Sequence, residues 1–242
     1  MKKVRAIFRI SGLVVTLGYY VGGLLIKTAI FGQDMTRGFR YRYKFTSICL
    51  KIAGVDLKVQ GQSVKGPTLY VSNHRSMLDP FIELHLIEAF IVSKAEVEKY
   101  PIIGSGAKAT GVIFVKRGEH TSRSAAKEAI LQTLVDGYSV LIYPEGTTSK
   151  EHTTQEFKLG SFKVAVEAGV PVVPVAIDYR DESHKWDEGG LLSFIMNKFA
   201  SRRIDTAMSI GEPLVGDDAV ALMNSSKAWI QAELIRMHGS WG

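Results

Sequence analysis

Short apolar runs alternate with helix-like segments from Gly54 onward, and this alternation limits the possible folds more than any other feature of the chain. Seven runs have the length and composition of strands, namely Asp56–Gln60, Thr68–Ser72, Phe90–Ser93, Gly111–Val115, Ser139–Ile142, Val172–Ile177 and Thr206–Ile210. Five segments have helical patterns, namely Met77–Glu88, Thr121–Asp136, Phe157–Ala168, Leu191–Phe199 and Asp218–Arg236. This order predicts an α/β fold with a mainly parallel central sheet flanked by helices. The polar residues 181–190 are expected to form a surface loop.

The N-terminal part is different, because the residues from Ile10 to Ile26 carry no charge. As a helix this stretch is about 26 Å long, slightly short of a full bilayer crossing. It could cross a membrane, lie in one leaflet or be a signal peptide. No small-residue cleavage site follows it, which disfavours a signal peptide. Basic residues before it (Lys2, Lys3, Arg5, Arg9) place the N-terminus on the cytoplasmic side.

Residues 34–53 have the pattern of a second helix. Four basic residues recur at spacings that place them on one stripe, namely Arg37, Arg40, Lys44 and Lys51. Aromatic and aliphatic residues occupy most of the remaining circumference, as in a helix at a membrane interface. The alternative is a helix packed on a soluble domain with a solvated charged edge. We therefore expect residues 1–53 to form an N-terminal, membrane-anchoring helix pair.

The charge distribution agrees with a membrane partner. The net charge is +6, but residues 1–44 hold nine basic residues against the single acid Asp34, so the remainder is slightly acidic. Basic charge around a hydrophobic stretch indicates an anionic membrane surface, and we expect no nucleic-acid partner. The single cysteine, Cys49, excludes an internal disulfide and lies in an apolar run typical of packing.

One histidine and one aspartate stand where a predicted strand gives way to a helix. His74 follows the strand ending at Ser72, and Asp79 is five residues further on. On a single straight helix the two side chains would point in different directions, but across a strand-to-helix turn they can meet. The aspartate can then accept from one ring nitrogen and leave the other as a base. The alternative is a core histidine beside a helix start, with Ser76 as N-cap and Asp79 as its partner.

Three later stretches contain or follow predicted strands, as the segment around His74 does. They are Gly111–Arg117 (GVIFVKR), Tyr143–Ser149 (YPEGTTS) and Val170–Val175 (VPVVPV). Arg117 and Glu145, like His74, each follow a predicted strand. Because ligands of open α/β sheets bind beyond the carboxyl ends of the strands, these residues are expected to share one site.

In their order and spacing, the block containing His74 and Asp79 and the three later stretches resemble the glycerolipid acyltransferases, the lysophosphatidic acid acyltransferase family. The resemblance covers about Leu57–Ile177 and implies an acyltransferase domain over residues 54–242. It implies transfer of a fatty acyl group from acyl-carrier protein or coenzyme A to the sn-2 hydroxyl of 1-acylglycerol 3-phosphate, giving phosphatidic acid. The thioester is a co-substrate, and no cofactor is implied. The implied location is the cytoplasmic face of a bacterial-type inner membrane.

Two other functions stay open. One is acylation of another lysolipid, either a lyso-phospholipid or a lyso-aminolipid. The other is a non-catalytic, membrane-binding module that keeps the fold.

The resemblance also implies a role for individual residues. His74 would be the general base and Asp79 its orienting partner. Arg117 would hold the phosphate of the acceptor, since a guanidinium matches phosphate with two parallel bonds, and Lys116 would add positive potential. Four further residues are implied in the acceptor site, namely Glu145, Gly146, Thr147 and Lys158. The family commonly has arginine where this chain has Thr148, which weakens the inference to a phosphate-bearing acceptor.

The sequence lacks the motifs of two other kinds of chemistry, serine hydrolysis and metal binding. There is no Gly-x-Ser-x-Gly nucleophile elbow, which disfavours a serine hydrolase. The six histidines show no metal-ligand spacing, so no metal is expected. Pro171 and Pro174 interrupt an apolar run and are interpreted as structural, shaping a strand edge.

Overall fold

A computed structural model describes residues 2–100, 103–115, 120–185 and 198–241. These residues form a seven-stranded sheet in the order β1-β7-β6-β2-β5-β3-β4. The strands are β1 (Val55–Gln60), β2 (Leu69–Ser72), β3 (Ala89–Lys94), β4 (Val112–Val115), β5 (Ser139–Ile142), β6 (Val172–Tyr179) and β7 (Ile204–Ile210). Every neighbouring pair is parallel except β6 and β7. All seven predicted strands and the mainly parallel sheet are thereby confirmed.

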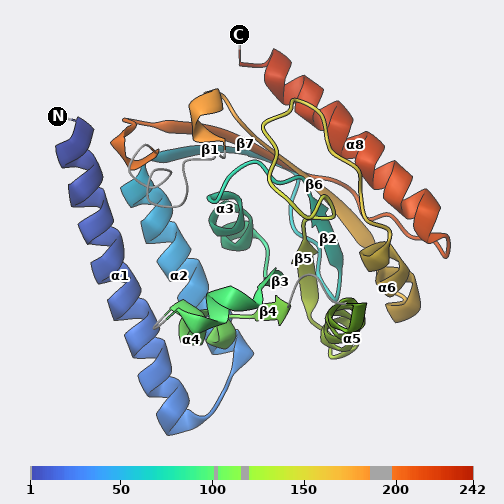
Figure 1. Ribbon diagram of the computed structural model, residues 1–242, viewed down its shortest axis with the longest axis horizontal. Helices are drawn as coiled ribbons and strands as arrows, with labels where there is room; N and C mark the ends of the chain where they lie inside the picture. Colours follow the sequence, from blue (N-terminus) through green and yellow to red (C-terminus); the bar gives the residue numbers. More distant parts are fainter. Residues whose placement is uncertain (1, 101–102, 116–119, 186–197, 242) are drawn as a thin grey trace.

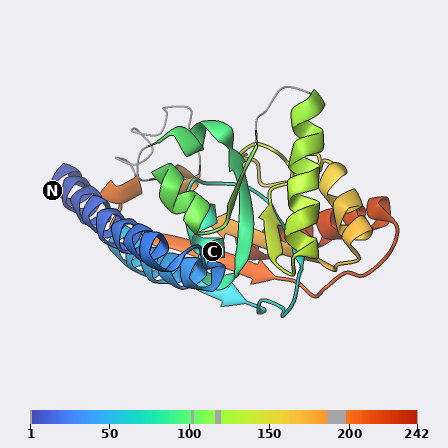
Figure 2. The ribbon, with the colours of Figure 1, turned by 90° about the horizontal axis from the view of Figure 1, so that it is seen from below.

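Helices cover both faces of this sheet (Figures 1 and 2). They are α1 (Lys2–Phe31), α2 (Met35–Ala53), α3 (Asp79–Leu86), α4 (Ile103–Ala109), α5 (His120–Val135), α6 (Gly160–Ala168) and α8 (Ala219–Gly239), with 3₁₀ turns η1 (Ala95–Lys99) and η2 (Glu182–His184). Side chains alternate between the faces along each strand. On β2, Leu69 and Val71 pack in the core under α5, α6 and α8, whereas Tyr70 packs in the core under α2 and α3.

The helices differ from expectation in several places; for example, α6 begins at Gly160 instead of Phe157 and α8 ends at Gly239 instead of Arg236. Helix α3 begins at Asp79 rather than near Ser76, and the Ser76 hydroxyl donates to the carbonyl of His184 instead of capping the helix. Helix α4 was not predicted, because its two glycines have low helical propensity. A Cβ on Gly104 would lie 2.0 Å from the carbonyl oxygen of Glu98, so close packing requires glycine there. Most of the predicted helix Leu191–Phe199 falls outside the described residues.

Two other expectations need correction. Pro174 lies on β6, which is an interior strand between β7 and β2, and not at an edge of the sheet. Its carbonyl accepts from the amide of Gly211, at the point where the β6–β7 ladder ends. The described part of the 181–190 segment is not simply a surface loop, because Lys185 is buried. Its amine forms ion pairs with Asp178 at 3.2 Å and with Glu182 at 2.8 Å.

The N-terminal helices form an antiparallel pair along one side of the molecule (Figure 1). Helix α1 is long and apolar enough to cross a membrane, judged by length and composition only. Only Ala6, Val21 and Leu24 of this helix are buried, and several large apolar side chains are exposed, including those of Phe8, Val15 and Ile30. The predicted second helix is confirmed, and α2 buries one face against the domain. There Arg42 donates to the carbonyl oxygens of Ala89 at 2.8 Å and Thr110 at 2.7 Å.

Cys49 belongs to that buried face of α2. Burial raises the pKa of its thiol to about 12, so the thiolate that nucleophilic chemistry requires is not formed at neutral pH. The interpretation of Cys49 as a packing residue fits this environment.

Candidate active site

The adjacent parallel strands β2 and β5 end side by side, with Val71 opposite Ile142, and the residues that follow them come into contact. His74 follows β2 and Tyr143 follows β5. Their rings are stacked, with centroids 4.0 Å apart and planes inclined by 11°. Asn73 fixes the end of β2 by exchanging two hydrogen bonds of 2.9 Å with the backbone of Ile177 on β6. The position of His74 is therefore set by three central strands.

His74 and Asp79 meet across the turn between β2 and α3. The ring Nδ1 of His74 is 2.8 Å from Oδ2 of Asp79, whose side chain is completely buried. Because the carboxylate accepts, Nδ1 carries the proton and the lone pair of the neutral ring lies on Nε2. Within the described ranges Nε2 has no hydrogen-bonding partner, and 16% of the His74 side chain is exposed. The geometry is that of an oriented base with one free nitrogen.

Asp79 also organises the turn itself. Its Oδ2 accepts from the backbone amides of Arg75 at 2.6 Å and Ser76 at 2.8 Å, and its Oδ1 accepts from the hydroxyl of Tyr179 at 2.6 Å. Four donors thus converge on one buried carboxylate. Such a network fixes the aspartate and, through it, the imidazole. Tyr179 was not expected in the site from the sequence.

Glu83 is a second buried carboxyl group, and the sequence pattern did not predict its place in the site. It lies one helical turn after Asp79 on α3, accepting from the hydroxyls of Ser72 and Tyr143, both at 2.5 Å. Burial, and then the charge of Asp79, raise the pKa of Glu83 well above its ordinary value, while the two hydrogen bonds act in the opposite direction. Glu83 thereby holds Tyr143, whose ring stacks on His74. The only sequence signal was an acid at i+4 from Asp79 in a mostly apolar segment.

Replacement of Glu83 by glutamine should change how stability depends on pH. A raised folded-state pKa means that the folded protein binds the proton more tightly than the unfolded chain. The contribution of Glu83 to the free energy of unfolding is therefore lost as pH rises from about 4.5 through the pKa of the folded state. The loss is about 1.4 kcal/mol for each unit by which the folded-state pKa exceeds the unfolded-state pKa. Glutamine cannot ionise, so the stability of Glu83→Gln relative to wild type should increase across this window.

Urea unfolding between pH 5 and 9 would measure this difference, using roughly unit steps of pH. Glu128→Gln, at an exposed position on α5, is the matched control and should show a flat difference. A flat difference for Glu83→Gln as well would contradict the assignment.

A tight turn that contains Gly146 follows β5. The amide of Gly146 donates to the carbonyl of Tyr143 at 3.0 Å, and Gly146 has a positive φ of 72°. A Cβ at this position would lie 2.2 Å from Nζ of Lys158, so the amine of Lys158 lies directly against the turn. The structure thus brings Gly146 and Lys158 together. Thr147 is exposed on the same turn.

Glu145 is buried beneath this turn rather than presented at the surface. Its Oε1 accepts from the amide of Gln155 at 3.4 Å. Burial raises the pKa of Glu145, and the positive charge of Arg75 lowers it to a smaller extent. Arg75 is itself fully buried and donates to the carbonyl of Ser149 at 3.4 Å. This hydrogen bond links the segment that follows β2 to the segment that follows β5. These contacts indicate that Glu145 supports the turn after β5 from its buried side.

Two of the predicted site residues, Lys116 and Arg117, lie outside the described residues. Strand β4 is described to Val115 and runs parallel to β3, which in turn is parallel to β5. Among the described residues, no group of three or more His, Cys, Asp or Glu side chains is arranged to hold a metal ion.

Together, the sheet and the paired residues define a class of protein: an α/β protein in which a buried aspartate orients a histidine at the carboxyl edge of the strands. The family model described as Acyltransferase matches residues 56–178, which is about half of the chain and includes both residues. The chain belongs to this acyltransferase family.

Individual relatives agree with this assignment. A lyso-ornithine lipid O-acyltransferase of Pseudomonas aeruginosa is 32% identical over 185 residues, covering 74% of this chain and 71% of that protein. A chloroplastic 1-acyl-sn-glycerol-3-phosphate acyltransferase of Brassica napus is 34% identical over 64% of this chain and 48% of that protein. A 1-acyl-sn-glycerol-3-phosphate acyltransferase of Neisseria gonorrhoeae is 31% identical over 48% of this chain and 46% of that protein.

The fold also matches a solved structure. The crystal structure of the 1-acyl-sn-glycerophosphate acyltransferase PlsC from Thermotoga maritima superposes with a TM-score of 0.77 over 98% of both chains, at 20% sequence identity. The match includes the N-terminal helices, since it extends over nearly the whole chain.

Proposed function

We propose that this protein transfers a fatty acyl group from a thioester to the hydroxyl of a lysolipid, with His74 as general base. The observation that carries the proposal is the 2.8 Å hydrogen bond between His74 Nδ1 and Asp79, which leaves Nε2 without a partner among the described residues. Nε2 takes the proton of the hydroxyl, whose oxygen attacks the thioester carbonyl. The carbon–sulfur bond breaks, and the imidazolium returns the proton to the leaving thiolate. No acyl-enzyme is required.

The acceptor that we favour is 1-acylglycerol 3-phosphate, acylated at its sn-2 hydroxyl to give phosphatidic acid. Relatives from Brassica napus and Neisseria gonorrhoeae are named for this activity. Arg117, with Lys116 and Lys158, would neutralise the phosphate, and Gly146 and Thr147 would offer the turn that contacts it. The donor would be acyl-carrier protein or coenzyme A carrying the acyl group.

A lyso-aminolipid is the second candidate acceptor, and two observations favour it. The relative from Pseudomonas aeruginosa, aligned over 71% of its length, is named a lyso-ornithine lipid O-acyltransferase. Thr148 stands where the resemblance leads one to expect arginine, and a hydroxyl offers only a neutral hydrogen bond. Losing a charge-assisted contact costs about 1.5–3 kcal/mol, or roughly 10–100-fold in binding. The preference for a phosphate-bearing acceptor therefore depends on Arg117 and Lys158.

Competition between the two acceptors tests this choice. Lysophosphatidic acid and lyso-ornithine lipid are mixed at equal concentration with one acyl thioester, and both products are quantified by mass spectrometry. We expect phosphatidic acid to predominate and Arg117→Ala to raise the KM for lysophosphatidic acid by roughly 10–100-fold. Thr148→Arg should leave that KM unchanged or lower it. Preference for the lyso-ornithine lipid would transfer the assignment to the second candidate while leaving His74 and Asp79 in their roles.

We also propose that α1 is embedded in the membrane, with the catalytic domain at its cytoplasmic face. The length of α1 and its exposed apolar side chains support insertion into the membrane, as opposed to attachment by charge alone. The protein should therefore stay with sedimented membranes in 1 M salt, where the Debye length is only about 3 Å. Detergent should release it. Release by salt without detergent would show that attachment is electrostatic and would refute embedding.

A further inference from the structure

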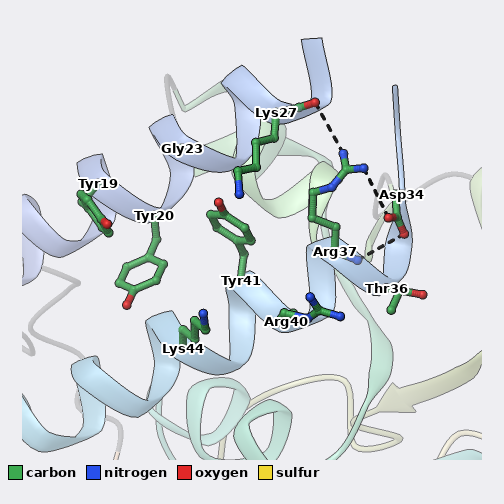
Figure 3. Close-up of a pocket in the computed structure, with 10 residues that line it drawn as sticks. All are labelled: Tyr19, Tyr20, Gly23, Lys27, Asp34, Thr36, Arg37, Arg40, Tyr41 and Lys44. Carbon is green, nitrogen blue, oxygen red and sulfur yellow. Dashed lines mark hydrogen bonds and ion pairs between the residues drawn. The ribbon is translucent and has the colours of Figure 1, made fainter. Parts of the chain in front are cut away.

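A pocket of about 420 Å³ opens between α1 and α2, at the end of the helix pair where the chain turns (Figure 3). Tyr20 and Lys27 contribute to it from α1, and Arg40, Tyr41 and Lys44 from α2. None of the residues around His74 lines it. The pocket is therefore separate from the candidate active site.

The pocket carries an excess of positive charge. One of its cations, Arg37, is used to hold the helices together, since it donates to the carbonyl of Gly32 at 3.0 Å and pairs with Asp34 at 3.4 Å. Asp34 is the single acid in the lining and is occupied by this pair. Among the described residues, Arg40 and Lys44 have no hydrogen bond or ion-pair partner. Two neighbouring cations without a partner favour an anionic ligand.

The surroundings of the pocket indicate which anion is suitable. Lys27 lies over the ring of Tyr41, with its amine 5.5 Å from the ring centroid. Exposed apolar residues of α1 flank Lys27 in the sequence, with Ile26 63% and Ile30 66% exposed. Tyrosine rings beside basic groups and an apolar helix face are typical of the level of the membrane where lipid head groups lie. A phosphate joined to acyl chains matches both features, whereas a free ion matches only the charge.

We propose that this pocket binds the phosphate of one anionic phospholipid, with Arg40 and Lys44 as the donors and the acyl chains against α1. The site is additional to the acceptor site around His74 and does not depend on the reaction. A guanidinium and an ammonium from consecutive turns of α2 present several N–H donors to one phosphate. Each charge-assisted hydrogen bond lost should weaken binding roughly tenfold to a hundredfold.

Native mass spectrometry of the full chain in detergent tests the proposal without turnover. The protein is titrated with phosphatidylglycerol, with phosphatidylcholine and, separately, with inorganic phosphate. We expect one tightly held phosphatidylglycerol, and weaker retention of phosphatidylcholine by at least tenfold. Arg40→Gln/Lys44→Gln should raise the dissociation constant at least tenfold, whereas Arg40→Lys/Lys44→Arg, which keeps both charges, should bind like wild type.

Lys3→Gln/Lys51→Gln is the matched control, because it removes two exposed charges from the same helices outside the pocket. This control should retain the lipid. Equal weakening by both double variants would overturn the site in favour of general electrostatic attraction. Displacement of the lipid by millimolar inorganic phosphate would overturn the lipid as the ligand. Circular dichroism verifies that each variant remains folded.

Discussion

Replacing His74 by alanine is expected to lower kcat for acyl transfer by about 10²–10⁴-fold, the usual contribution of a positioned general base. Without the imidazole, nothing at the end of β2 takes the proton of the acceptor hydroxyl. The ring is also largely buried against Tyr143, so a moderate loss of stability should accompany the loss of activity. Thiol release from the acyl donor gives kcat, and thermal unfolding gives the stability.

The two effects can be separated with His74→Gln, which fills part of the same space but is not a base. It should recover stability while leaving kcat low. Near-normal turnover in either variant would refute the catalytic assignment of His74.

Replacing Asp79 by asparagine should have the second largest effect, with kcat falling by roughly 10²-fold and somewhat less than in His74→Ala. An amide oxygen in the place of Oδ2 can still accept from His74 and the amides of Arg75 and Ser76. The hydroxyl of Tyr179 can rotate to accept from the new amide group. The protein should therefore fold, but it lacks the negative charge that stabilises the imidazolium.

Tyr179→Phe is the control for this prediction, because it removes one hydrogen bond to Asp79 and keeps the charge. Its kcat should stay within about tenfold of wild type. If Tyr179→Phe and Asp79→Asn lost activity equally, the role of Asp79 would be positional rather than electrostatic.

The features that could be predicted from the sequence are those determined locally. The central strands β2, β5 and β6 are short, mainly apolar runs that contain β-branched residues, and such runs stay strands in the folded protein. The contact between His74 and Asp79 followed from placing them across a strand-to-helix turn. The meeting of the segments after β2 and β5, seen in the stacking of His74 on Tyr143, followed from the parallel arrangement of these strands.

The features that were missed depend on partners far away in the sequence. Ser76 looked like a helix cap, but its hydroxyl bonds to the carbonyl of His184, 108 positions away. Glu83 carries no sequence signal of its partner, yet its buried carboxyl group accepts from the hydroxyl of Tyr143, 60 positions away. Helix α4 contains two glycines and forms because close packing against η1 and α1 compensates for their weak propensity. A local sequence pattern does not predict contacts between residues that are far apart in the chain.

The central claim is that the His74 site transfers the acyl group to a lipid hydroxyl and not to water. The most direct test is to follow thiol release and ester formation together, using purified full-length protein, an acyl thioester and lysophosphatidic acid. We predict one diacyl product for each thiol released, almost no free fatty acid, and loss of both products in His74→Ala. Thiol release matched by free fatty acid, with no new ester to any lysolipid, would contradict the account.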